Sequence, residues 1–301
     1  MMSSFYVDLL SNASLDIYPN NTLAFFSNFM TNPINLGSAS EWEVALTDIS
    51  FPNRVYNITE GKFTLGYIPT PSLSLSLKTA HHPDAVTQVE RLPDVPFLNQ
   101  YQTFVIPKGF YTEMGQIIAA MNLQIATFTN IQDTISFKYH VEALNLSFTF
   151  EGTTTGQSRI FFKVESEDLA QVLGLGTDAI YCESNLIDAP YPCDIARFHT
   201  IFVYSDIVDF ANVGNVKNQL LRAFTFRQRT KNEDLQVMYP YDNRSFSNLQ
   251  YRNVRLDRFN SIQIEIRDMK GNLIPFTSLG LVVLNLHFRK KLTVNANSNV
   301  E

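Results

Sequence analysis

Histidine and cysteine side chains are the groups in this sequence best suited to bind a metal ion. His81 and His82 are adjacent in a proline-flanked segment, where neighbouring side chains on an extended backbone point in opposite directions. A zinc site needs three or four converging ligands, usually with two of them closely spaced on one element. The remaining candidates are scattered along the chain: His140, His199, His287, Cys182 and Cys193. The sequence therefore predicts no metal site and no cofactor.

The two cysteines are also weak candidates for nucleophilic catalysis. Cys182 and Cys193 could use His199 as a base, but no local pattern pairs them, and small thiols usually serve packing. The N-terminus lacks a basic region and Asp8 interrupts its short apolar run, so we expect no cleaved signal peptide. Without export, we expect two free thiols rather than a disulfide.

Closely spaced carboxylates are the remaining candidates for general acid and base catalysis. Such catalysis needs two carboxyl groups that face one cleft with separated pKa values. Glu41 and Glu43 flank Trp42 on the expected solvent face of a strand. Asp268 begins a predicted turn between the last two strands, in which Gly271 is expected at a positive φ. The three pairs considered are Glu41 with Glu43, Asp206 with Asp209, and Glu265 with Asp268. We interpret them as solvated edges, and the sequence predicts no catalytic residue.

A glycine-rich string at residues 174–179 matches the G-x-G-x-x-A pattern of dinucleotide-binding loops. In those loops the glycines precede a helix whose N-terminus binds the pyrophosphate. Here Gly174 follows a helical pattern instead, and no helical pattern opens after Ala179. We interpret the string as a helix C-terminus and a turn, with Leu175 placed for a Schellman contact.

The charge balance disfavours a nucleic-acid-binding protein. The chain of 301 residues carries 29 acidic and 23 basic side chains, a net charge of −6, whereas binding through phosphates needs a concentrated basic surface. The basic residues form three short clusters: Arg222, Arg227, Arg229 and Lys231; Arg252, Arg255 and Arg258; and Arg289, Lys290 and Lys291. We interpret them as solvated faces, and a weak nucleic-acid contact fits the last cluster best.

Alternating apolar and polar residues dominate both ends of the chain, as in antiparallel strands with one solvated face. The alternation is clearest where Ile262, Ile264 and Ile266 alternate with polar residues. Three strands are predicted first, around residues 5–9, 23–29 and 42–49, and five later, at residues 198–210, 220–227, 235–239, 259–267 and 281–289.

The middle of the chain combines helical and strand-like patterns of apolar residues. Residues 110–128 place six apolar residues at helical spacing, with Thr112 as the predicted N-cap: Met114, Ile117, Ile118, Met121, Ile125 and Phe128. A shorter helix begins at Ser166, carries Leu169, Val172 and Leu173 on one face, and ends at Gly174. Predicted strands surround both helices at residues 62–67, 73–77, 102–106, 135–139, 144–150 and 160–164.

These elements predict a mainly β protein, an eight-stranded antiparallel double-sheet jelly roll with an inserted α+β domain. The first three strands fall in residues 1–60, the insertion in 61–196, the last five strands in 197–292, and a flexible polar tail in 293–301. No run of about 18 apolar residues occurs, so no membrane-spanning helix is predicted.

Six segments together resemble a known protein family. In chain order they are residues 3–29, 41–58, 104–122, 169–174, 198–221 and 259–289. They are similar to the penton, or minor capsid, proteins of Maverick/Polinton-type viruses and virophages, and the length is similar to that of the mavirus-type penton. The resemblance covers nearly the whole chain apart from its tail.

The resemblance implies a single jelly roll with an inserted upper domain. It also implies a structural role, with homopentamers of the protein at the fivefold vertices of an icosahedral virion. The neighbours would then be a double jelly-roll major capsid protein, within a virion assembled in the infected host cell. Two alternatives stay open: a carbohydrate- or receptor-binding jelly-roll module, and a cupin-type enzyme, whose clustered His and carboxylate ligands the sequence lacks.

Overall fold

The computed structural model describes most of the chain, in two compact units. The described residues are 3–69, 101–127, 134–140, 145–151, 158–175, 180–183, 186–189, 191–195, 200–226, 241–277 and 280–291. The first unit contains the described residues before position 56 and from position 200 onward, and the second contains those between 56 and 195. Each unit has its own hydrophobic core.

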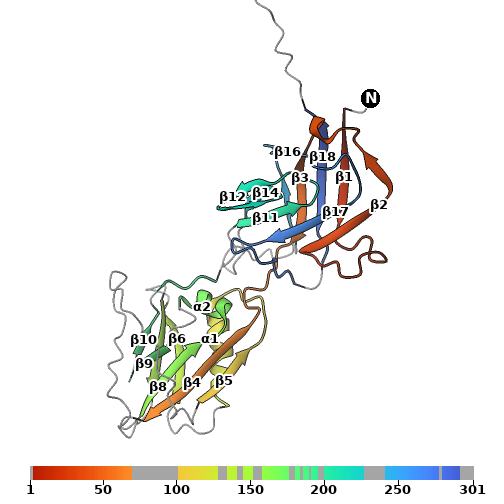
Figure 1. The fold of residues 1–301 in the computed structure, drawn as a ribbon. Helices are drawn as coiled ribbons and strands as arrows, with labels where there is room; N and C mark the ends of the chain where they lie inside the picture. The colour runs from red at the N-terminus through yellow and green to blue at the C-terminus, as the bar shows by residue number, and fades with distance from the viewer. Residues whose placement is uncertain are drawn as a thin grey trace, which may run out of the picture. The chain divides into compact units, whose positions relative to one another are not determined.

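Two antiparallel sheets build the first unit (Figure 1). One has the order β1-β18-β3-β15, with the short β16 also paired to β3, and the other has the order β14-β11-β17-β2. The strands of the first sheet are β1 (Ser4–Leu10), β18 (Val283–Lys290), β3 (Trp42–Pro52), β15 (Tyr241–Ser245) and β16 (Arg252–Asn253). Those of the second are β14 (Leu220–Thr225), β11 (Thr200–Ser205), β17 (Arg258–Arg267) and β2 (Phe25–Asn35).

The strand order of this unit is that of a jelly roll. Counting the eight principal strands along the chain, one sheet has the order 1-8-3-6 and the other 5-4-7-2. The pairs 1–8, 2–7, 3–6 and 4–5 are therefore all hydrogen-bonded neighbours, as in a long antiparallel ribbon wound into two layers. The predicted fold class is confirmed, and we call this part the jelly-roll unit.

The core of the jelly-roll unit lies between its two sheets, because buried and outward-facing side chains alternate along the strands. Ile262, Ile264 and Ile266 of β17 are fully buried, whereas Gln263 and Glu265 lie on the outer face. From the opposite sheet, the indole N–H of the chain's single tryptophan, Trp42, donates a hydrogen bond to the Leu36 carbonyl oxygen over 3.1 Å. Because this indole is buried in the jelly-roll core, its fluorescence reports on the folding of that unit.

Two strand predictions of the jelly-roll unit need correction. The strand expected over 198–210 ends at Ser205, because the chain then turns into a small hairpin of β12 (Ala211–Val213) and β13 (Val216–Asn218). Gly214 has the positive φ of 61° that this hairpin requires. The strand expected over 235–239 lies outside the described residues, and β15 begins at Tyr241.

The second unit contains two further antiparallel sheets. The four-stranded sheet has the order β5-β4-β8-β9 and the three-stranded sheet has the order β10-β7-β6. Their strands are β5 (Tyr101–Ile106), β4 (Gly61–Pro69), β8 (Ser158–Val164), β9 (Ile180–Glu183), β10 (Leu186–Asp188), β7 (Asn145–Glu151) and β6 (Thr134–His140). Five of the six strands predicted for this region are confirmed, and the one at 73–77 falls outside the described residues.

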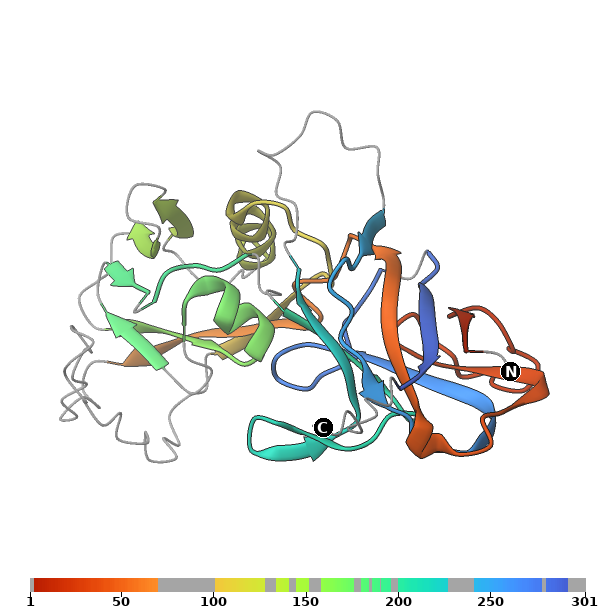
Figure 2. The same ribbon diagram turned by 90° about the horizontal axis from the view of Figure 1, so that it is seen from above.

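Two helices contribute to the core of this second unit. They are α1 (Met114–Ile125) and α2 (Glu167–Leu173), drawn in Figure 2 as the two coiled ribbons next to the strands of this unit. Their apolar faces are buried as predicted, with Ile117, Met121, Leu169 and Val172 fully inaccessible to solvent. No helix in the described part of the chain is long and apolar enough to cross a membrane.

The predicted N-cap of α1 is wrong. Glu113, not Thr112, occupies the N-cap position. The backbone N–H and the hydroxyl of Thr112 both donate to Oε1 of Gln116, over 2.9 and 3.3 Å. Glu113 makes no side-chain hydrogen bond to the first turn of the helix.

Gly271 lies in the turn that follows β17 and has a φ of 85°, as predicted for this position. The turn is held by Asp268, whose Oδ1 accepts hydrogen bonds from the backbone N–H groups of Lys270 and Asn272. A Cβ atom at Gly271 would meet nothing within 4 Å, so only the backbone conformation opposes a side chain there.

We expect Gly271→Val to lower the free energy of unfolding by about 1–2 kcal/mol, the cost of left-handed backbone for a residue with a Cβ atom. The measurement is urea unfolding followed by Trp42 fluorescence. Gly271→Asn is the control and should lose less, because asparagine tolerates this conformation. An unchanged midpoint for the valine variant would contradict the prediction.

The ends of β3 and β11 that flank the second unit in sequence lie close together inside the jelly-roll unit. The ring of Phe51 in β3 lies 6.0 Å from that of Phe224, and Phe224 is the direct cross-strand partner of Ile201 in β11. The chain therefore leaves and re-enters the jelly roll at neighbouring points. That residues 61–196 form an independently folding insertion stays a prediction, as does the flexible tail, which lies outside the described residues.

Candidate functional site

The described histidines and cysteines do not converge. His140 ends β6, His287 lies in β18, and the thiol of Cys193 contacts the Leu173 carbonyl oxygen at 3.5 Å. Cys182 lies in β9, but its side chain, like His81, His82 and His199, is outside the described part of the structure. Within the described residues, no group of three or more His, Cys, Asp or Glu side chains could hold a metal ion.

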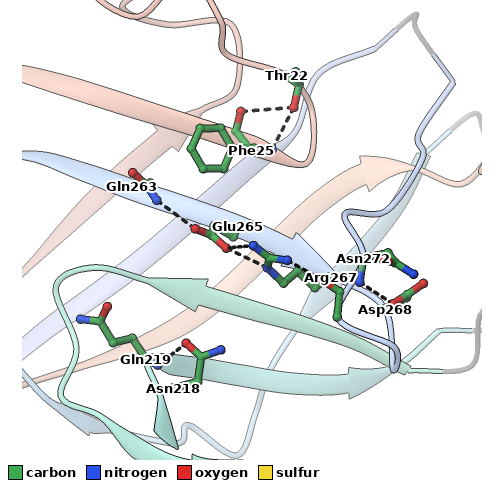
Figure 3. A network of polar contacts seen from close by, with 10 residues as sticks. Thr22, Phe25, Asn218, Gln219, Gln263, Glu265, Arg267, Asp268 and Asn272 are labelled. Atoms are coloured by element: carbon green, nitrogen blue, oxygen red, sulfur yellow. Dashed lines mark hydrogen bonds and ion pairs between the residues drawn. The ribbon is translucent and has the colours of Figure 1, made fainter. Parts of the chain in front are cut away.

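The carboxylates of Glu265 and Asp268 have separate structural partners (Figure 3). Glu265 forms an ion pair with Arg267 over 2.6 Å and accepts a hydrogen bond from the Gln263 side chain over 3.0 Å, all along the outer face of β17. Asp268 instead accepts the backbone N–H groups of the turn that contains Gly271. The two carboxylates therefore have different partners, and their interpretation as a non-catalytic pair stays a prediction.

The carboxyl group of Asp206 is partly buried. Burial raises its pKa, although Oδ1 accepts a hydrogen bond from the backbone N–H of Gln263 over 2.9 Å. Asp209, three residues later, is exposed to solvent. The two side chains therefore occupy different environments.

We expect Asp206→Asn to stabilise the jelly-roll unit at pH 7. A carboxyl group whose pKa is raised by folding contributes less stability as pH rises above its unfolded value, because the folded state must then hold a buried charge. Asparagine keeps the Oδ1 acceptor for Gln263 without that charge. Trp42-monitored unfolding at pH 4 and pH 7 should show a larger gain at pH 7. Asp209→Asn is the matched control, and an equal gain there would contradict the assignment.

The last basic cluster lies beside acidic residues. Arg289 forms an ion pair with Glu43 over 2.7 Å, and Lys290 forms one with Glu41 over 3.2 Å. The ammonium group of Lys291 donates to the Ser40 carbonyl oxygen over 2.6 Å. Two of the three cations are therefore paired with carboxylates, Arg289 with Glu43 of β3 and Lys290 with Glu41 just before that strand.

Arg222 departs from the prediction of a solvated basic face. It faces the core opposite Val203 and retains only 8% of its side-chain exposure. Its guanidinium stacks 3.8 Å above the Phe246 ring and donates from Nη1 to the Asn248 carbonyl oxygen, while burial lowers its pKa. Arg227, Arg229 and Lys231 lie outside the described residues. Arg222 is buried because its position on β14 faces inward. The pattern of charges along the sequence does not reveal which way a residue faces.

Gly174 ends α2 as a left-handed residue, with φ 70° and ψ 30°. The N–H of Leu175 donates to the Ala170 carbonyl oxygen, and that of Gly174 donates to Gln171, which is the Schellman pattern. Leu175 is buried in the second core. The structure therefore confirms the helix C-terminus and the contact of Leu175 for the described part of this string, and residues 176–179 lie beyond it.

A row of side chains on the outer face of β1 and β18 was missed in the sequence. Antiparallel register pairs Ser4 with Arg289, Tyr6 with His287, and Asp8 with Asn285. The Tyr6 ring stacks on the His287 ring at a centroid distance of 4.5 Å, and the Asn285 amide donates to Asp8 over 2.5 Å. The spacing of residues within either strand does not predict this row, because β1 and β18 come from opposite ends of the chain.

A shallow apolar groove lies at one end of the jelly-roll unit. It has a volume of about 460 Å³ and lies between residues 11–24, which connect β1 to β2, and residues 273–276, which follow β17. Leu15 and Leu273 line it and are exposed, as are nearby Ile17 and Met269. Contiguous exposed apolar surface marks sites of interaction with a protein, a membrane or a ligand.

Of three comparisons with known proteins, only the comparison with solved structures gave matches. No protein-family model and no curated protein matches the sequence. The crystal structure of the mavirus penton protein aligns with 96% of this chain and 100% of its own, at 9% identity and a TM-score of 0.44. A chain of the cryo-EM structure of the Sputnik virophage aligns with 97% of this chain and 99% of its own, at 14% identity and a TM-score of 0.41.

Proposed function

We propose that this protein is a structural capsid protein, a penton subunit that forms homopentamers at the fivefold vertices of an icosahedral virion. The observation that carries the proposal is the strand order 1-8-3-6 and 5-4-7-2, an architecture common among viral capsid proteins. A jelly roll also occurs in proteins with other functions, so the choice among them rests on the sequence resemblance to pentons.

The resembling segments coincide with the elements that define the fold. They include most or all of nine elements: β1, β3, α1, α2, β11, β12, β13, β17 and β18. The resemblance therefore extends over both sheets of the jelly roll and over the core of the second unit. It is not confined to one stretch of chain.

Association of copies has a physical basis in the exposed apolar groove. A closed ring of five subunits repeats one heterologous interface, in which a surface of one subunit contacts a different surface of the next. Leu15 and Leu273 place apolar surface at the rim of the groove without a covering partner in the described chain. The proposed partners are other copies of this chain and a double jelly-roll major capsid protein, within the virion and without enzymatic activity.

The test is to co-express the chain with the major capsid protein of the same virus and to image the particles by cryo-EM. We expect this chain as five copies at each fivefold vertex. Leu15→Asp with Leu273→Asp should reduce incorporation while Trp42 fluorescence stays native, and Leu123→Asp, an exposed leucine of α1, is the matched control. Particles that exclude the chain, or that carry it away from the fivefold vertices, would overturn the proposal.

A further inference from the structure

Tyr6 is the large apolar side chain most open to solvent on its sheet. It is 63% exposed, and no other large apolar residue on the described strands of this sheet is exposed. Because β1 pairs only with β18 among the described strands, it forms an edge of the sheet. One face of the Tyr6 ring is covered by His287 in a near-parallel stack of 19°, which leaves the other face open beyond that edge.

A chain of contacts holds this ring in place from behind. His287 Nδ1 lies 2.8 Å from the Tyr251 hydroxyl, and the Arg289 guanidinium lies 3.5 Å above the Tyr251 ring. Arg289 is in turn held by Glu43 of β3, so its charge is directed toward the inner strands and away from β1. An aromatic surface that is fixed before a ligand arrives costs less entropy to use in binding.

Polar groups flank the open ring face at the spacing of alternate residues. Ser4 and Asp8 are both exposed and lie two residues to either side of Tyr6, on the same face of β1 and about 7 Å from it along the strand. The Asp8 carboxylate is oriented by the Asn285 amide. The arrangement presents one apolar ring between a hydroxyl and a fixed hydrogen-bond acceptor.

We propose that Tyr6, with Ser4 and Asp8, forms a binding site for an uncharged pyranose ring of a glycan. The C–H bonds on one face of a pyranose carry partial positive charge and fit the electron-rich face of an aromatic ring. Its hydroxyl groups donate to the Asp8 carboxylate and exchange hydrogen bonds with the Ser4 hydroxyl. The site is separate from the apolar groove, so it can fail or succeed independently of capsid assembly.

The charges of Asp8 and Arg289 and the small apolar area around Tyr6 favour a sugar over other ligands. Among the described residues no cation pairs with the Asp8 carboxylate, and Arg289 is paired with Glu43, so phosphates of a nucleic acid are disfavoured. A protein partner would bury about 800 Å² with an apolar centre, but a single exposed ring supplies too little apolar surface for that. A small neutral ligand with one apolar face fits the site.

The test is saturation-transfer NMR on the full chain with the methyl glycosides of glucose, galactose, mannose and N-acetylglucosamine. We expect transfer to the ring protons of at least one glycoside. Tyr6→Ala should abolish the transfer, and Asp8→Ala should weaken binding about tenfold, the value of one hydrogen bond to a charged group. Tyr6→Phe should keep it, because the stack on His287 and the open ring face are both retained.

Tyr191→Ala is the matched control, since Tyr191 has the same 63% exposure in the other unit. It should leave the saturation transfer unchanged, and Trp42 fluorescence should show that each variant is folded. The proposal is overturned if none of the four glycosides receives transfer from the unmodified chain, or if transfer survives in Tyr6→Ala. It is also overturned if an eight-nucleotide oligothymidylate binds at Tyr6 more tightly than every glycoside.

Discussion

Gly174→Ala is expected to lower the free energy of unfolding of the second unit by about 3 kcal/mol or more. A left-handed backbone costs about 1–2 kcal/mol for a residue with a Cβ atom, and overpacking against rigid surroundings adds about 1–3 kcal/mol. Both apply here, because a Cβ atom at Gly174 would overlap the Tyr191 carbonyl oxygen and lie 2.8 Å from its carbon. These are backbone atoms and cannot rotate away. The Tyr191 N–H also donates to the Gly174 carbonyl oxygen, which ties the two segments together.

Hydrogen exchange of peptides covering residues 101–127 and 158–175 would measure the effect on the second core. Gly271→Ala is the matched control, because it has a similar positive φ but open space around the added Cβ atom. Gly271→Ala should lower the free energy of unfolding of the jelly-roll unit by only the cost of a left-handed backbone, about 1–2 kcal/mol. Equal losses for the two alanine variants would show that the contact with Tyr191 contributes nothing.

Replacing residues 61–196 by a short Gly/Ser linker should leave the jelly roll able to fold. All eight principal strands lie outside the deleted segment, and the ends of β3 and β11 already meet around Phe224. The entropy cost of closing a loop grows slowly with its length, so the native insertion is not needed to hold these ends together. The shortened chain should show β-sheet circular dichroism, a native Trp42 emission and a cooperative melt.

The same shortened chain with Phe26→Asp supplies the unfolded baseline, since Phe26 is completely buried in the jelly-roll core. A shortened chain indistinguishable from that baseline would refute the insertion. A second measurement uses the full chain, with spin labels at positions 58 and 198. A separation of more than about 20 Å, the reach of six extended residues, would also count against it.

Local patterns were sufficient for most of the principal strands, for both helices and for several turns of this protein. The alternation of Ile262, Ile264 and Ile266 identified β17 and its buried face, because side chains on a strand point alternately to its two sides. Helical spacing identified α1 and its buried residues in the same way. Gly174 and Gly271 were placed correctly because a positive φ is a local steric demand that glycine meets at least cost. The count of three strands and five strands then led to the jelly roll.

Contacts between distant strands could not be read from these patterns. Arg289 and Glu43 are 246 residues apart, and Tyr6 meets His287 only because β1 pairs with β18 in one particular register. Arg222 is buried because its position on β14 faces inward, and the N-cap of α1 is Glu113, one residue later than predicted. The period of side chains along a strand is local, whereas the partner of each strand depends on how all the apolar faces pack at once. The sequence alone therefore indicated most of the strands, both helices and the fold class, and only the tertiary structure decided which side chains share a surface.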